Sequence, residues 1–201
     1  MLHQMDQQTI QTYNLMAREY DEETKDFWER FPKAFFDEFA SLTAHTVLDL
    51  GSGPGRDGLL LKERGLEVTC LDASTAMLAL CKEKNLTTVL GDFKNIPLND
   101  SSFDSVWAYT SLLHIPKSEM PQALREIHRV LHPHGILGLG LIEGTTEGYR
   151  ESSGVDKPRW FSYYTKEEIK NLLRSHGFEI ISFSQFNPKT KNYLHFIAKK
   201  I

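Results

Sequence analysis

Hydrophobic and polar positions follow two alternating patterns along this chain. Short runs rich in β-branched residues and leucine are typical of buried strands. They predict strands at residues 46–50, 67–71, 87–90, 103–108, 135–142, 178–186 and 193–199. Most of these runs are separated by segments in which apolar residues recur every three or four positions, as in amphipathic helices. The segments predict helices at about residues 56–64, 74–84, 118–131 and 165–177.

The order of these elements predicts the fold class. Strands that alternate with helices form an open, twisted, mostly parallel sheet with helices on both faces, which is the Rossmann-like doubly wound α/β class. The last two strand runs are separated only by a short segment that contains Asn187 and Pro188, a hairpin signal. We therefore expect seven strands, mostly parallel, with an antiparallel strand in the C-terminal hairpin.

Two segments lie outside this alternation. Before the first strand, apolar residues fall on helical faces, which predicts helices over residues of about 5–42. One face holds Ile10, Tyr13, Ala17 and Tyr20, and another holds Trp28, Phe31, Phe35, Phe39 and Leu42. After the fifth strand, residues 143–164 form a long stretch rich in polar and aromatic groups, and loops of such length are commonly functional. We expect both segments to form a cover that becomes ordered when a ligand binds.

Composition and charge fit one domain that spans residues 1–201. The chain is 40% hydrophobic and 25% charged, which is ordinary for a globular protein. Its net charge of −4 gives no electrostatic reason to expect nucleic acid or an anionic membrane as a partner. The sequence has neither an apolar run of membrane-spanning length nor a start that resembles a signal peptide. Cys70 and Cys81 form no disulfide framework, so a reducing, cytoplasmic location is expected.

Candidate chemistry begins where the first strand ends. Asp49 is followed by Gly51, Gly53 and Gly55, so the chain turns tightly there and lets a ligand approach bare backbone. Asp72 ends the next strand, where an acid can accept hydrogen bonds from a ribose diol. Together these residues indicate an adenosine-containing cofactor. A dinucleotide motif would need glycine at position 56, which is arginine, and the Gly-Lys-Ser/Thr of a P-loop is missing.

The glycine turn and the acid before it resemble the first motif of the class I S-adenosylmethionine-dependent methyltransferases, and the resemblance extends over residues of about 10–201. It implies S-adenosylmethionine as cofactor and S-adenosylhomocysteine as product. It also implies that the seventh strand lies between the fifth and the sixth. In the family, the glycine turn receives the methionine part, the acid after the second strand binds the ribose, and an acid after the third strand binds adenine. The cofactor residues so implied are Asp49, Gly51, Ser52, Gly53, Gly55, Asp72, Ala73, Met77, Gly91, Asp92, Phe93, Tyr109 and Thr110.

The acceptor side is expected around the end of the fourth strand. Residues 103–115 resemble the fourth motif of small-molecule methyltransferases, which implies that His114 lies near the acceptor. If the acceptor is a hydroxyl, His114 could remove its proton as the catalytic base, since an ordinary histidine pKa is about 6.5. The alternative is a structural histidine that bonds across the loop. The two cover segments contribute the candidate substrate residues Tyr13, Arg18, Tyr20, Arg150, Trp160 and Tyr163.

Two further features leave alternatives open or exclude a site. Arg56 either pairs with Asp57, binds the carboxylate of the cofactor, or is a solvated helix residue. His128 and His132 have the spacing of metal ligands on a helix, but no acid or cysteine completes a site, so no metal is expected.

The sequence as a whole predicts methyl transfer to a small molecule. One alternative is a cofactor-binding or regulatory protein that kept the fold without turnover, because fold does not determine function. The other is a methyltransferase that acts on protein or RNA. The sequence identifies neither the acceptor nor the oligomeric state.

Overall fold

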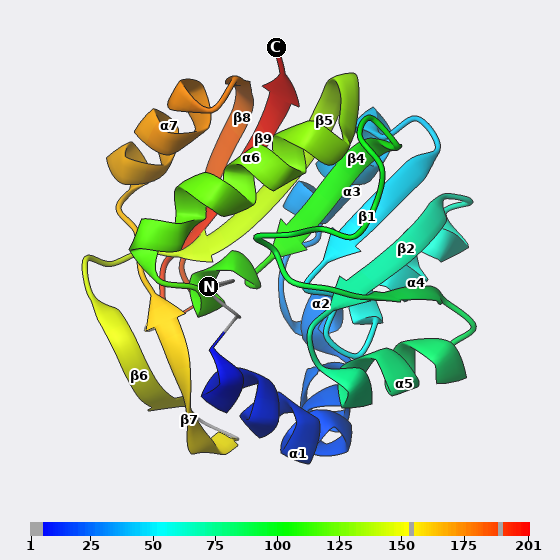
Figure 1. Cartoon of the computed structure of the whole chain (residues 1–201), viewed down its shortest axis with the longest axis vertical. Coiled ribbons are helices and arrows are strands. Elements are labelled where there is room, and N and C mark those ends of the chain that lie inside the picture. Colours follow the sequence, from blue (N-terminus) through cyan, green and yellow to red (C-terminus); the bar gives the residue numbers. More distant parts are fainter. Residues whose placement is uncertain (1–5, 153–154, 189–190) are drawn as a thin grey trace.

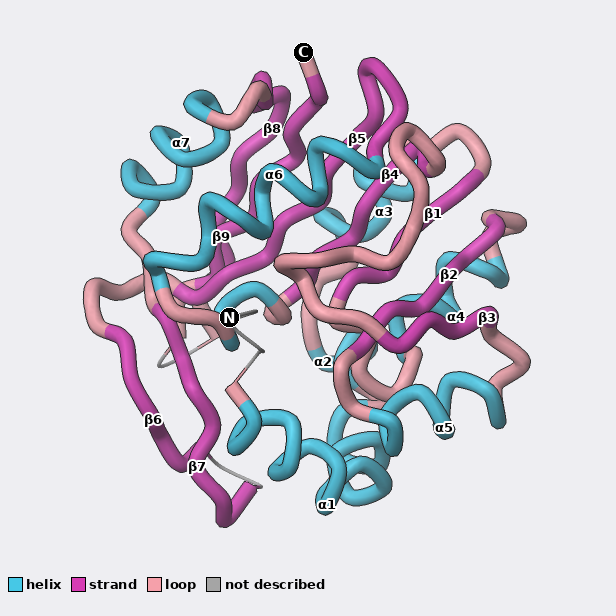
Figure 2. The backbone as a smooth tube through the Cα atoms, in the orientation of Figure 1, coloured by secondary structure: helices cyan, strands magenta, loops and turns pink. Residues whose placement is uncertain are grey.

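The centre of the protein is a seven-stranded sheet in the order β3-β2-β1-β4-β5-β9-β8, as seen in a computed structural model that describes residues 6–152, 155–188 and 191–201 (Figures 1 and 2). Its strands in chain order are β1 (Thr46–Leu50), β2 (Glu67–Asp72), β3 (Thr87–Leu90), β4 (Phe103–Tyr109), β5 (Leu131–Ile142), β8 (Phe178–Phe186) and β9 (Tyr193–Lys200). A separate two-stranded sheet pairs β6 (Glu147–Ser152) with β7 (Val155–Ser162).

The pairing directions agree with the predicted fold class. β3, β2, β1, β4 and β5 form a parallel series, and β9 pairs antiparallel with both β5 and β8. The last strand along the chain thus lies between the fifth and sixth strands of the central sheet, as the resemblance implied. The Rossmann-like prediction of seven mostly parallel strands with an antiparallel C-terminal strand is confirmed.

Helices cover both faces of this sheet (Figure 1). On one face, α6 (Met120–Val130) and α7 (Lys166–Ser175) pack against strand residues that include Leu48 and Val106. On the other, α3 (Ala34–Leu42), α4 (Arg56–Glu63) and α5 (Thr75–Glu83) pack against residues that include Val47 and Trp107. Successive strand residues therefore alternate between two apolar layers, which is the side-chain period of a strand.

The N-terminal segment divides into three helices with different roles. They are α1 (Gln7–Thr24), α2 (Phe27–Arg30) and α3, and the break between α2 and α3 falls at Phe31, whose extended backbone precedes Pro32. In α3, Phe36 and Phe39 are fully buried against Trp107. The expectation that the whole of residues 5–42 covers a site is therefore wrong for α3, which is part of the core. Leu42, expected on the apolar face, is 44% exposed, and residue 5 lies outside the described residues.

The segment 143–164 was expected to be a loop, but most of it forms the β6–β7 hairpin. The hairpin forms a sheet of its own, and β7 packs against α1 and against residues 112–114 (Figure 1). Its strands therefore lack the long apolar runs that identified the other strands, and only tertiary contacts reveal it. Residues 153–154, between the two strands, lie outside the described residues.

β5 begins earlier than predicted. The structure extends this strand back to Leu131, and the segment between Leu131 and Ile136 is an irregularity in its pairing with β4. His134 in this irregularity has a φ of 65°. Among the described residues, no helix has the length and apolar character needed to span a bilayer.

Candidate active site

One pocket opens at the carboxyl ends of β1, β2 and β4 and is bordered by residues of α1. It has about 750 Å³ of empty space, part of which is open to solvent. Its walls come from α1, the turn after β1, the end of β2, the end of β4 and Phe93. The lining residues are Thr9, Ile10, Tyr13, Tyr20, Thr24, Asp49, Gly51, Ser52, Gly53, Pro54, Arg56, Asp57, Asp72, Ala73, Ser74, Met77, Phe93, Tyr109, Thr110, Ser111 and His114.

The turn after β1 has a backbone that requires glycine. Gly51 and Gly53 have φ values of 72° and 53°, in the left-handed region that side chains disfavour. A Cβ at Gly51 would lie 2.4 Å from the Cβ of Ser111, so this part of the turn packs tightly on the end of β4. A Cβ at Gly53 would meet nothing within 4 Å. The turn therefore presents bare backbone to open space in the pocket at Gly53, which is a surface that a ligand can occupy.

Asp72 lies beside this turn at the end of β2. Its Oδ2 accepts a hydrogen bond from the Gly53 N–H at 2.9 Å, and its Oδ1 accepts one from the Ser74 N–H at 2.8 Å. Burial raises the pKa of the Asp72 carboxyl above its ordinary value. Because each carboxylate oxygen can accept two hydrogen bonds, both oxygens keep capacity for a ligand hydroxyl.

Asp49, which also lines the pocket, has an unsatisfied oxygen. The carboxyl is buried, and its Oδ2 has no hydrogen-bond partner within the described part of the chain. Burial, followed by the negative charge of Asp57, raises the pKa of Asp49 well above its ordinary value. A buried carboxylate oxygen without a partner is uncommon in native proteins. Its position in the pocket suits a ligand that carries a positively charged hydrogen-bond donor.

Asp57 and Arg56 form a buried ion pair behind the turn. The Asp57 carboxylate accepts hydrogen bonds from Arg56 Nε at 2.7 Å, from the Trp28 indole at 2.7 Å and from the Trp107 indole at 2.8 Å. Burial alone would raise the pKa of Asp57, but the charge of Arg56 and these hydrogen bonds lower it below its ordinary value. The Arg56 guanidinium also lies 4.5 Å from the centre of the Phe27 ring. Arg56 is thus paired with Asp57, and the interpretation of a solvated residue is wrong.

His114 belongs to a buried chain of hydrogen bonds that joins three segments. Its Nδ1 lies 2.6 Å from the carbonyl oxygen of Trp160, and its Nε2 lies 2.7 Å from the hydroxyl of Tyr13. A carbonyl can only accept, so Nδ1 carries the proton and Nε2 accepts from Tyr13. Arg159 donates to the same Tyr13 oxygen at 2.7 Å.

This arrangement corrects the expectation that His114 has the ordinary pKa of a general base. Burial, with a smaller contribution from the charge of Arg159, lowers the pKa of His114 to about 3. Burial likewise raises the pKa of the Tyr13 phenol well above its ordinary value. Both ring nitrogens of His114 are bonded to protein groups. Although His114 lines the pocket, its contacts are those of a structural histidine that bonds across to α1 and β7.

The structure brings most of the expected cofactor residues together. Of the thirteen named from the sequence, ten line the pocket, and Gly55, Gly91 and Asp92 do not. Asp92 accepts a hydrogen bond from the Lys94 N–H at 2.9 Å, as a turn residue does, while the adjacent Phe93 lines the pocket. Thr110 has a φ of 51°, which is strained for a β-branched residue, and it lies at the same edge. Such strain is often found at functional sites.

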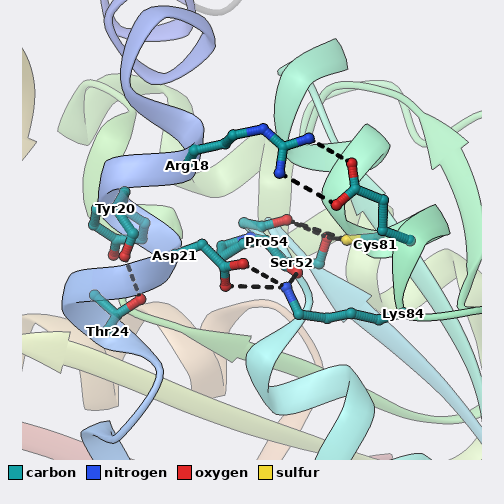
Figure 3. Close-up of polar contacts among 10 residues, drawn as sticks. Arg18, Tyr20, Asp21, Thr24, Ser52, Pro54, Cys81 and Lys84 are labelled. Carbon is teal, nitrogen blue, oxygen red and sulfur yellow. Dashed lines mark hydrogen bonds and ion pairs between the residues drawn. The ribbon is translucent and has the colours of Figure 1, made fainter.

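The expected substrate residues divide into two groups. Tyr13 and Tyr20 line the pocket, but four others do not. Arg18 pairs with Glu83 on the surface (Figure 3), because its position on α1 faces α5. The Arg150 guanidinium lies 5.3 Å from the centre of the Tyr163 ring, and neither residue is part of the pocket lining. Trp160 does not line the pocket, but its backbone carbonyl is bonded to His114, which does.

Several lining residues were missed by the sequence analysis, chiefly Thr9 and Thr24 on α1. They lie four residues before Tyr13 and four after Tyr20, so helical spacing places them on the face that holds both tyrosines. A search for polar residues on that face would have found them. Among the described residues, no group of three or more histidine, cysteine or acidic side chains is placed to hold a metal ion.

Comparisons with known proteins agree with this geometry. A family model described as a methyltransferase domain matches residues 47–135. A malonyl-[acyl-carrier protein] O-methyltransferase of Salmonella typhimurium is 32% identical over 134 residues, which cover 64% of this chain and 53% of that protein. The chain therefore spans about half the length of this relative.

Two solved structures share the fold. One is a complex of DhpI with S-adenosylhomocysteine, with a TM-score of 0.81, 21% identity, and coverage of 100% of this chain and 98% of that one. The other is the 1,6-didemethyltoxoflavin-N1-methyltransferase of Burkholderia thailandensis, with a TM-score of 0.70, 21% identity, and coverage of 95% and 87%.

Proposed function

Because the chain belongs to the class I S-adenosylmethionine-dependent methyltransferases, we propose that it transfers a methyl group from S-adenosylmethionine to a small-molecule acceptor. The observation that carries this proposal is the conjunction, in one pocket, of a carboxylate without a partner at Asp49, an exposed stretch of bare backbone at Gly53, and a second carboxylate at Asp72. Asp49 is complementary to an ammonium group, the backbone at Gly53 to an aliphatic chain that packs closely on it, and Asp72 to a ribose diol. All three groups occur in S-adenosylmethionine.

Each cofactor group has a candidate partner in the pocket. Asp72 would accept hydrogen bonds from the ribose hydroxyls, and Asp49 would bind the α-ammonium group. Arg56, already paired with Asp57, is the one cationic residue among the described lining residues and would face the α-carboxylate. Phe93 and Met77 would contact the adenine ring.

The pocket supports catalysis mainly by orientation. When bound, S-adenosylmethionine supplies a methyl group on a positively charged sulfur, already activated for transfer. The residues of this chain would then hold an acceptor atom in line with that methyl group and exclude water, which accounts for much of the acceleration in such reactions. Tyr13, Thr110 and His114 form the wall that would orient the acceptor.

The side chains of the pocket also restrict the kind of acceptor that can react. His114 is neutral and fully hydrogen-bonded, and Tyr13 donates to it. Of the three acids that line the pocket, Asp49 and Asp72 are assigned to the cofactor and Asp57 is paired with Arg56. No described lining residue is then left as a general base. We therefore expect an acceptor atom whose lone pair is free at neutral pH, such as a heteroaromatic nitrogen or an amine of low basicity.

The similar proteins support a small-molecule acceptor without identifying it. One is named as acting on malonyl-[acyl-carrier protein], and another binds 1,6-didemethyltoxoflavin. The net charge of −4 gives no support to a nucleic acid substrate. We expect the protein to act in the cytosol, where reducing conditions keep thiols such as Cys70 and Cys81 free.

The experiment is to incubate the protein with methyl-labelled S-adenosylmethionine and a metabolite extract, and to identify the labelled product by mass spectrometry. The expected product is a methylated small molecule, with the label on nitrogen. Asp72→Ala should yield far less of it. Label on the oxygen of an un-ionised alcohol would contradict the absence of a base, and no binding of S-adenosylhomocysteine would contradict the proposed function itself.

A further inference from the structure

Lys84 lies outside the pocket, at the residue that follows α5, yet its ammonium group joins two of the walls of the pocket. Its Nζ donates to both carboxylate oxygens of Asp21 on α1, at 3.0 and 2.8 Å, and to the carbonyl oxygen of Pro54, at 2.8 Å (Figure 3). These contacts use all three N–H groups of the ammonium. The Lys84 and Asp21 side chains are only 23% and 26% exposed, so the pair is partly shielded from water.

On one side, Lys84 restrains the glycine turn. Pro54 lies between Gly53 and Gly55, two residues with positive φ and much conformational freedom in the absence of outside contacts. The carbonyl of Gly53 also accepts a hydrogen bond from α5, through the Cys81 thiol at 3.2 Å (Figure 3). Two successive carbonyls of the turn are thus bonded to one helix end. The conformation that exposes Gly53 to the pocket depends on these bonds.

On the other side, Lys84 restrains the part of α1 that faces the pocket. Asp21 follows Tyr20 and precedes Thr24 by three residues, and both Tyr20 and Thr24 line the pocket. The Thr24 hydroxyl donates to the Tyr20 carbonyl at 2.7 Å, which ties these two residues together (Figure 3). A single ammonium group therefore fixes the position of the α1 wall relative to the glycine turn.

We propose that Lys84 is a positioning residue that couples the closure of α1 to the cofactor-binding conformation of the glycine turn. The inference rests on the proposed function for the identity of the ligand. Breaking the bridge releases both walls together, so a smaller fraction of the protein is competent to bind. The apparent affinity for the cofactor falls in proportion to that fraction.

The same two helices offer a matched control. Arg18 and Glu83 form a second ion pair between α1 and α5, at 2.7 Å, adjacent to the first in the chain (Figure 3). Their side chains are 77% and 53% exposed, and neither lines the pocket or contacts the glycine turn in the described structure. Exposed pairs of this kind contribute little to stability. Glu83→Gln removes an ion pair between the same helices without touching the turn.

The test measures S-adenosylhomocysteine binding by calorimetry to the wild type, Lys84→Met, Asp21→Asn, their double variant, and Glu83→Gln. Lys84→Met should weaken binding about ten-fold or more, the scale of hydrogen bonds to a charged group. Glu83→Gln should bind as the wild type does. The double variant should bind no more weakly than Lys84→Met, because both changes break one bridge. Lys84→Met with wild-type affinity would overturn the inference.

Hydrogen exchange without ligand provides a second measurement that does not depend on the proposed function. In Lys84→Met, amides of residues 20–24 and of residues 51, 52, 53 and 55 should exchange faster together, while those of α7 stay unchanged. Faster exchange at only one of the two segments would refute the coupling. If the wild type binds no S-adenosylhomocysteine, the proposed function fails, whereas this exchange result still tests the role of Lys84.

Discussion

At the scale of single residues, the three acidic side chains that line the pocket differ in how many hydrogen-bond donors they have. Asp57 has three donors from the protein, Asp72 has two backbone donors, and one oxygen of Asp49 has none within the described chain. A fully bonded carboxylate supports structure, whereas an incompletely bonded one in a pocket can bind a ligand. By this criterion, Asp49 and Asp72 are the acids available for a cofactor.

Substitution of Asp72 tests this assignment. Asp72→Ala removes the acceptor of the expected ribose hydrogen bonds and should weaken S-adenosylhomocysteine binding by roughly 1.5–3 kcal/mol. Calorimetry measures the effect. Asp100→Ala is the control, because Asp100 is an exposed acid that pairs with Arg129. Unchanged affinity in a folded Asp72→Ala protein would refute the ribose assignment.

The buried His114 predicts a dependence of stability on pH. Its pKa is about 3 in the folded protein, against about 6.5 when unfolded. Between these values the unfolded state binds a proton that the folded state does not, so stability is retained above pH 6.5 and lost as the pH falls. The maximum slope for one such group is about 1.4 kcal/mol per pH unit.

Urea unfolding of the wild type and of His114→Gln, at a series of pH values from 7 to 4.5, measures this slope. The wild type should lose stability more steeply than the variant. His195, whose pKa burial lowers to about 4, contributes a loss of the same sign in both proteins and therefore cancels in the comparison. Equal slopes would show that His114 does not have the lowered pKa.

At the scale of elements, two of the helices that border the pocket, α1 and α5, begin at a side-chain cap. The Asp6 carboxylate caps α1 by accepting the Thr9 N–H at 2.8 Å, and the Ser74 hydroxyl caps α5 by accepting the Met77 N–H at 3.2 Å. Asn14 on α1 accepts a hydrogen bond from the same Ser74 hydroxyl at 2.8 Å. The start of α5 is therefore joined to α1 beside Asp72, in addition to the two ion pairs at the other end of α5.

The capping box of α7 gives a prediction about an element distant from the pocket. The Thr165 hydroxyl accepts the Glu168 N–H at 3.2 Å, and the Glu168 carboxylate accepts the Thr165 N–H at 2.6 Å. Thr165→Ala should lower the free energy of unfolding by about 1 kcal/mol. Thr165→Ser, which keeps the hydroxyl, should unfold as the wild type does. Affinity for S-adenosylhomocysteine should be the same in all three proteins, and a loss in Thr165→Ala would contradict this separation.

At the scale of the whole molecule, α1 lies between α5 and the β6–β7 hairpin and forms one wall of the pocket. On one side it is bonded to α5 through Asn14, Arg18 and Asp21. On the other it meets the β6–β7 hairpin, where the buried Thr9 hydroxyl accepts the Trp160 N–H at 2.8 Å. A ligand that fills the pocket would contact α1 and would stabilise both sets of contacts.

Hydrogen exchange with and without S-adenosylhomocysteine tests this arrangement. Protection should rise in α1 and in β7, because the ligand holds α1 against both neighbours. Protection in α3 should stay unchanged, since Phe36 and Phe39 are buried in the core whether or not a ligand is present. Equal protection of α1 in both states would count against its role as a cover, and a change in α3 would show that the N-terminal helices move as one.

The sequence by itself determined the parts of this protein that depend on local patterns. Runs such as 46–50 and 87–90 coincide with β1 and β3, because enrichment in β-branched residues and leucine is visible in a few neighbouring residues. The Ser74 and Thr165 caps and the glycine turn were predictable for the same reason, since each motif lies within about four residues. The positions of Asp49 and Asp72 were predictable as well, because Asp49 lies in the first predicted strand and Asp72 directly follows the second.

Tertiary structure alone decided the roles that depend on distant partners. The short sequence around His114 does not show that burial, with a smaller contribution from the charge of Arg159, lowers its pKa. Its two ring nitrogens are bonded to Tyr13, 101 residues away, and to the Trp160 carbonyl. Arg18 lies on the surface, where it pairs with Glu83 of α5. The helix α3 belongs to the core because its aromatic residues pack against Trp107 on β4. Electrostatic and packing effects act through space, so the pKa of a histidine and the exposure of an arginine depend on which segments the fold brings together.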